Sequence, residues 1–156
     1  MSNNIDKIVK IDHPKLKPYV KGLWLSELRS KKYQQGTEWL KTVQFGKESK
    51  YCCLGILTEI YLKEHKEEWI TPSIDEDSHV QLCSITDDIE RRKALPPKRV
   101  NEWALDDTSK GIKDHPWVYE KHISEKGLEF EWSLWKDNDC KKLTFLQIAD
   151  IIEEEY

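Results

Sequence analysis

Apolar residues recur at helical spacing in four segments of the chain. The clearest stripe lies at the C-terminal end, where a phenylalanine, an alanine and three isoleucines share one helical face between residues 145 and 152. Thr144, just before this stripe, and Gln147, within it, have the spacing of a capping box, which marks the start of a helix. The same periodicity is weaker elsewhere. It predicts helices over residues 18–30, 52–63, 97–105 and 144–154.

Short segments between these helices carry the apolar and polar alternation of strands. Residues 128–132 alternate strictly, and 117–119 are similar. Apolar positions in 39–45, 69–70 and 80–83 predict further strands, with the polar turn 46–50 closing a hairpin onto Tyr51. An acidic loop is expected over 73–78, a short helix over 86–93 and a loop over 106–114.

The order of these elements decides the fold class. Strands and helices do not alternate as parallel βαβ units would, so the chain is predicted to be α+β. We expect about four helices packed with several short antiparallel strands around a single core. A chain of 156 residues is long enough for one core without disulfides or metals. The expected organisation is one domain over 1–156, with an extended lead-in (1–17) and a compact core (18–156).

Composition and charge narrow the functional classes. The net charge is −4 and charged residues make up 35% of the chain, which argues against duplex nucleic acid as a partner. Seven tryptophans make the chain tryptophan-rich and supply a core that a disordered chain would lack. Neither a signal peptide nor a membrane span is predicted. The expectation is a cytoplasmic protein with reduced thiols and no membrane partner.

Two adjacent cysteines, Cys52 and Cys53, lead directly into a predicted helix. A helix N-terminus lowers a thiol pKa, so either cysteine is a candidate nucleophile. None of the five histidines falls in a motif that would supply the base. The competing interpretation is that the pair packs as small hydrophobic residues inside the core. The sequence favours the second interpretation, and no catalytic residue is assigned.

Motifs for metals and cofactors are missing from the sequence. There is no Cys-x-x-Cys, no His pair at helical spacing and no glycine-rich phosphate loop, so no metal and no cofactor are predicted. A basic segment with Arg29, Lys32 and Tyr33 adjoins the turn Gln35-Gly36. Cations beside aromatic rings can hold a nucleotide, the cations on phosphate and the rings on the base. A solvated helix end is the alternative explanation.

Four motifs, in this order along the chain, resemble a family of small, mostly uncharacterised proteins of tailed bacteriophages and prophages. Residues 28–36 (LRSKKYQQG) are similar to the family's LRSGKYxQG, and 51–57 (YCCLGIL) to its FCCLGVL. Residues 95–103 are similar to LPxxVxxW with one extra residue, and 138–153 to ND…SFxxIADxIE. Lys31 stands where the family usually has glycine, and SLWKDND replaces its LxxLND. Residues 1–20 and 106–130 are not covered by the resemblance.

The resemblance implies a phage origin and action in the cytoplasm of a bacterial host. The leading hypothesis is an accessory protein that counters host antiviral immunity by sequestering a small nucleotide signal without catalysis. Two alternatives stay open: an inhibitor that binds a host defence protein directly, and a cysteine-dependent enzyme. A homo-oligomer is also left open. The hypothetical ligand site consists of Trp24, Arg29, Lys32, Tyr33, Gln35, Gly36, Tyr51, Cys52, Cys53, Asn138 and Asp139.

Overall fold

The structure is a computed structural model that describes residues 7–44, 47–75, 80–84, 95–106 and 116–156. The described residues form an α+β fold in which five helices and two small sheets share one core. The helices are α1 (Pro18–Arg29), α2 (Cys53–His65), α3 (Lys98–Ala104), α4 (Leu134–Asp139) and α5 (Phe145–Glu155). The strands are β1 (Lys7–Lys10), β2 (Gln34–Gln35), β3 (Lys41–Gln44), β4 (Lys50–Tyr51), β5 (Ile70–Asp75), β6 (Val80–Ser84), β7 (Val118–Ile123) and β8 (Glu129–Ser133).

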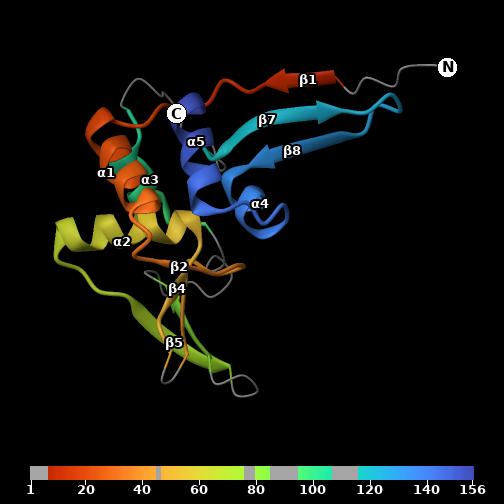
Figure 1. The fold of residues 1–156 in the computed structure, drawn as a ribbon. Coiled ribbons are helices and arrows are strands. Elements are labelled where there is room, and N and C mark those ends of the chain that lie inside the picture. Colours follow the sequence, from red (N-terminus) through yellow and green to blue (C-terminus); the bar gives the residue numbers. More distant parts are fainter. Residues whose placement is uncertain (1–6, 45–46, 76–79, 85–94, 107–115) are drawn as a thin grey trace.

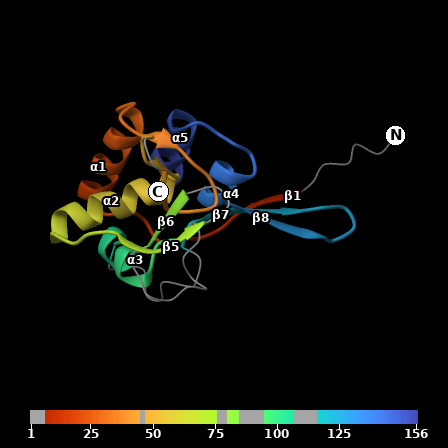
Figure 2. The same ribbon diagram turned by 90° about the horizontal axis from the view of Figure 1, so that it is seen from below.

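Two sheets extend from the helices in different directions (Figures 1 and 2). The first is antiparallel, has the order β1-β7-β8 and projects past α4 and α5. The second has the order β2-β4-β3-β6-β5, and its β2–β4 pair is parallel. The predicted hairpin onto Tyr51 is confirmed, because β3 and β4 pair antiparallel with Lys41 opposite Tyr51.

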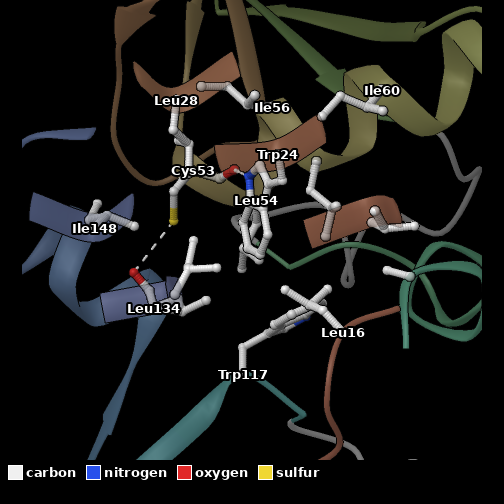
Figure 3. Packing of buried hydrophobic residues seen from close by; sticks show 14 of the residues in the cluster. Leu16, Trp24, Leu28, Cys53, Leu54, Ile56, Ile60, Trp117, Leu134 and Ile148 are labelled. Atoms are coloured by element: carbon white, nitrogen blue, oxygen red, sulfur yellow. Dashed lines mark hydrogen bonds between the residues drawn. The ribbon is translucent and has the colours of Figure 1, made fainter. Parts of the chain in front are cut away.

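The core lies where α1, α2, α4 and α5 meet (Figure 3). Trp24 from α1 and Trp117, just before β7, are fully buried and pack edge to face. The indole N–H of Trp24 donates to the carbonyl of Cys53 at 3.0 Å, and that of Trp117 donates to Asn101 Oδ1 at 3.1 Å. Each buried indole therefore has the partner that its polar group needs.

Helix α2 is buried along most of its length and passes directly over the chain before β3. A Cβ on Gly55 would lie 1.8 Å from the carbonyl oxygen of Leu40. Leu40 also accepts from the Cys52 N–H at 3.2 Å. The start of α2 is therefore held against Leu40 at a separation that only glycine allows.

All four predicted helices are confirmed to within two residues at each end. The predicted capping box on α5 is also present, with Thr144 and Gln147 bonded reciprocally. Helix α4 is an addition, since no helix was predicted over these residues. The predicted loop over 73–78 is wrong for 73–75, which continue β5. The predicted helix over 86–93 and nearly all of the predicted loop over 106–114 lie outside the described residues.

The lead-in contributes to the fold more than the sequence indicated. Strand β1 pairs with β7, and both His13 and Leu16 are buried. Leu16 forms an isolated bridge with Leu105. Residues 7–16 are thus tied to the rest of the chain by backbone pairing and by burial. No helix in the described ranges is long and apolar enough to cross a membrane.

We predict that Gly55→Ala lowers the free energy of unfolding by about 3 kcal/mol or more, because the new methyl group collides with backbone rather than with a mobile side chain. Gly22→Ala is the matched control. Gly22 is also helical, and nothing lies within 4 Å of a Cβ placed there. The control should raise stability by about 0.5–1 kcal/mol. Urea denaturation of both variants measures the contrast, and equal stabilities would contradict the contact with Leu40.

Candidate functional site

The amide of Asn138 joins three segments that are far apart in the sequence. Its Oδ1 accepts from Gln35 Nε2 at 2.8 Å and from the Cys53 N–H at 3.3 Å. Its Nδ2 donates to the carbonyl of Gly36 at 2.8 Å and to Asp139 Oδ1 at 2.7 Å. We call these five residues the polar junction. Every polar atom of the Asn138 side chain is thus used inside the protein.

The partners of Asn138 are themselves fixed. Gln35 Nε2 also donates to the carbonyl of Leu143 at 2.7 Å, and Asp139 Oδ2 accepts from the Glu38 N–H at 3.0 Å. Burial raises the pKa of Asp139. The structure brings together Gln35, Gly36, Cys53, Asn138 and Asp139, which all belong to the hypothetical ligand site. Their polar groups, however, bond to one another and to the protein backbone.

Both vicinal cysteines are buried. The Cys52 sulfur caps α2 by accepting from the Gly55 N–H at 3.3 Å, and the Cys53 thiol donates to the carbonyl of Leu134 at 3.5 Å (Figure 3). Burial raises the pKa of Cys52 to about 12 and that of Cys53 well above its usual value. The helix N-terminus therefore does not offset the loss of water, and both groups stay protonated thiols at neutral pH.

Histidines do not approach these thiols in the described ranges. His13 bonds the Pro14 carbonyl, His65 bonds the Tyr61 carbonyl, and His122 contacts Glu120. A cysteine nucleophile would need a base within hydrogen-bond reach. The described part of the chain thus gives the cysteine-enzyme alternative no catalytic pair.

The basic bend after α1 turns its cations toward the protein's own carboxylates. Arg29 bonds Asp150 at 3.0 Å and Glu153 at 2.6 Å, both on α5. Lys32 pairs with Glu27 at 3.3 Å. Lys31, between them, is exposed and has a left-handed backbone with φ of 59°. Arg29 and Lys32 are therefore partly neutralised before any ligand arrives.

Three aromatic rings and two lysines gather beside this bend, and we call them the aromatic–lysine cluster. Tyr33 and Tyr51 meet edge to face at 5.1 Å between ring centroids, and Tyr51 and Trp69 at 6.4 Å. The Lys41 ammonium lies 5.3 Å from the Tyr51 ring and 5.4 Å from the Trp69 ring. Lys63 lies 6.0 Å from the Tyr33 ring. The cluster draws on five separate segments, from the α1–β2 connection to the start of β5.

Charge within this cluster is uneven. Lys63 lies 3.7 Å from Glu59, whose other oxygen accepts from the Trp69 indole at 2.5 Å. Lys41 has no carboxylate within ion-pair distance among the described residues. Burial, with Glu27 and Glu59 nearby, raises the pKa of Tyr33, so the phenol stays neutral. Of the two lysines in this cluster, Lys41 is therefore the one whose charge no carboxylate among the described residues neutralises.

The residues of the sequence hypothesis lie in different parts of the structure. Trp24, Cys52, Cys53 and Asn138 are buried, and Arg29 is bound to α5. Gln35, Gly36 and Asp139 bond Asn138 in the polar junction. Tyr33 and Tyr51 belong to the aromatic–lysine cluster, and Lys32 directly precedes Tyr33. The sequence analysis missed Lys41, Lys63 and Trp69 as partners of the two tyrosines. Only the pairing of β3 with β4 brings Lys41 to Tyr51, and no local motif signals it.

Acidic and thiol groups do not form a metal centre in the described residues, where no group of three possible ligands comes together. Asp137, next to the polar junction, is instead held by the Tyr119 hydroxyl at 2.5 Å and by Lys141 at 3.3 Å. The Asp137 carboxylate therefore already has a hydrogen-bond donor, Tyr119, and a cation, Lys141, within the protein.

The structure is thus that of a small α+β protein. Its polar junction is satisfied by internal hydrogen bonds, and its aromatic–lysine cluster is partly exposed. The chain belongs to a family described as a domain of unknown function (DUF8296), whose model matches residues 16–156. None of the curated proteins and none of the solved structures matches it.

We expect Asn138→Ala to destabilise the protein by about 3–5 kcal/mol, because it leaves the buried Cys53 N–H and the Gly36 carbonyl without partners. Asp150→Ala is the control, since it removes an exposed partner of Arg29 and should cost less than about 1 kcal/mol. Thermal and urea unfolding measure both. A small loss in Asn138→Ala would contradict the role of the polar junction.

Thiol labelling of the native protein should modify one cysteine quickly. Cys140 is exposed, whereas Cys52, Cys53 and Cys83 are buried, so only Cys140 should react with iodoacetamide at neutral pH before unfolding. Mass spectrometry counts the labels, and urea should release all four sites. Cys140→Ser is the control and should abolish the fast label. Rapid labelling of Cys52 or Cys53 would support the enzyme alternative.

Proposed function

We propose that this protein is a non-catalytic binding protein for a small nucleotide-type ligand and that the aromatic–lysine cluster is its site. The observation that carries the proposal is the position of the Lys41 ammonium beside two rings, 5.3 Å from Tyr51 and 5.4 Å from Trp69. A nucleotide offers a planar base for ring contacts and an anionic phosphate for an ammonium.

Accessibility supports the cluster over the residues first chosen. Tyr33, Lys41 and Trp69 are partly exposed, and Lys63 is exposed. The polar junction is satisfied internally and has no unused donor on Asn138. A ligand at the cluster would contact the two lysines and the exposed parts of Tyr33 and Trp69, which pack against the core, while Tyr51 is itself buried.

Electrostatics supports an anion rather than a second cation. The cluster brings Lys41 and Lys63 together, with Lys32 near Tyr33, against the carboxylates Glu27 and Glu59. Glu59 accepts a hydrogen bond from the Trp69 indole and lies near Lys63, so its negative charge is partly neutralised. Among the described residues of the cluster, Lys41 is then the lysine whose positive charge is free to attract an anion.

The biological role follows from the motif resemblance alone. If the four motifs reflect a phage relative, the ligand would be a nucleotide signal of host antiviral immunity, held in the host cytoplasm and kept from its receptor. Stoichiometric binding without turnover is what such sequestration requires. Inhibition of a host defence protein by direct contact remains the competing proposal.

Isothermal titration tests the ligand class. Cyclic dinucleotides and cyclic ADP-ribose isomers are titrated into the full chain, followed by mass analysis of the ligand. We expect at least one to bind with a Kd in the micromolar range or below and to be recovered intact. Lys41→Gln should weaken binding about tenfold, as loss of one charge-assisted contact predicts.

Lys126→Gln is the matched control, because Lys126 is an exposed lysine in the β7–β8 turn, remote in sequence from the cluster. Its affinity should equal that of the unsubstituted protein. Absence of heat with every nucleotide would overturn the sequestration proposal and favour a protein target. Recovery of a cleaved ligand would overturn the non-catalytic assignment.

A further inference from the structure

The β1-β7-β8 sheet projects from the helices as an arm (Figures 1 and 2). Large apolar side chains lie exposed on it, with Ile8 at 57%, Leu128 at 58% and Phe130 at 54% of their full accessible area. Exposed apolar residues that gather on one element indicate a contact surface more than scattered ones do. The proposed ligand site does not involve this arm.

Strand register places two of these residues in one row. Ile8 is opposite His122, and His122 is opposite Phe130. Since side chains alternate along a strand, Glu129 and Glu131 point to the other face of β8, as Lys7 does on β1. One face of the arm carries Ile8 and Phe130 at its two edges, with Lys10 on the same face as Ile8. The other face carries Lys7 and Val9 at the β1 edge and Glu129 and Glu131 at the β8 edge, where Glu129 also pairs with Lys121 at 3.0 Å.

Both β1 and β8 are edge strands. The Ser124 N–H bonds the Leu128 carbonyl at 2.9 Å, and the alternation of an antiparallel ladder then turns the backbone groups of Glu129 and Glu131 away from β7. The Ile11 N–H bonds the Tyr119 carbonyl at 3.1 Å, so the same alternation turns those of Ile8 outward. Each edge thus presents backbone donors and acceptors that a further strand could pair.

Near the base of β8 the outer edge is partly closed. The Lys136 ammonium donates to the carbonyl of Glu131 at 2.7 Å. A lysine on an edge strand limits unwanted pairing. The part of the strand around Glu129 and Phe130 has no such cap among the described contacts, so pairing would begin there.

Charge decides which strand fits. Two antiparallel β8 strands would place glutamates next to glutamates, which is unfavourable, and two β1 strands would give Lys7 no acidic partner. A β1 strand that runs parallel to β8 places its outward-facing Ile8 beside Phe130, between Glu129 and Glu131, and brings Lys7 to the face of these two glutamates. Both faces then match at once.

We propose that β1 of a second copy of this chain pairs in parallel with the outer edge of β8, through backbone hydrogen bonds, Lys7 beside Glu129, and Ile8 beside Phe130. Such an addition of a strand to an open sheet is a recurring mode of recognition. The contact is heterologous: each copy binds one neighbour through its β1 edge and another neighbour through its β8 edge. Assembly then proceeds to a closed ring or to a longer array.

Charge reversal on each edge tests the proposal. Lys7→Glu gives the arm two acidic edges, and Glu129→Lys with Glu131→Lys gives it two basic edges. We expect the unsubstituted protein to gain mass with concentration in light scattering and sedimentation velocity, and salt to weaken this. Each variant alone should need at least a tenfold higher concentration, and an equimolar mixture of the two should assemble again.

Two controls separate this contact from general charge effects. Glu154→Lys on α5 and Lys98→Glu on α3 reverse exposed charges away from the proposed strand pair and should assemble as the unsubstituted protein does. Circular dichroism verifies that each variant is folded. A monomer at all concentrations, assembly unchanged in the single variants, or a mixture that stays monomeric would each overturn the proposal, as would association only with a different protein.

Discussion

The polar junction around Asn138 is the interaction on which the rest of the structure depends. One buried amide holds the turn before β3, the first residue of α2 and the end of α4 in a single arrangement. Buried amides are costly unless every donor and acceptor is used, and this one uses all of them. The junction therefore selects one relative placement of segments that are about a hundred residues apart. The neighbouring core is apolar and would tolerate small shifts more readily.

This arrangement gives a physical reason for three of the motifs seen in the sequence. The Gln-Gly turn, the Cys-Cys-Leu-Gly segment and the Asn-Asp pair meet at the junction and its immediate surroundings. Cys52 caps α2, Gly55 lets it approach Leu40, and Asn138 closes the contact. Their chemistry first indicated a ligand site, yet their contacts hold the native fold together. The polar groups of Asn138 are therefore already used within the protein.

Much of the fold could be predicted from the sequence because local sequence patterns mark most of its helices. Thr144 with Gln147 and the apolar stripe of α5 are sufficient for that helix. Helix α4 lacked such a signal, because two of its three buried residues, Asp137 and Asn138, are polar and break the apolar pattern. Lys31 looked like a departure from the resembling motif, but its φ of 59° is the conformation for which glycine is suited. The turn survives there at the cost of about 1 kcal/mol of backbone strain. The aromatic–lysine cluster was beyond sequence analysis because its residues come from five separate segments that only the tertiary fold brings together.

The distribution of thiols has a consequence for handling the protein. Three cysteines are enclosed, and Cys140 faces solvent at the end of α4. During storage without reductant, Cys140 would form covalent dimers by air oxidation, and these would carry no information about strand pairing. Mass measurements on aged samples would then report sulfur chemistry, whereas freshly reduced samples would report reversible association.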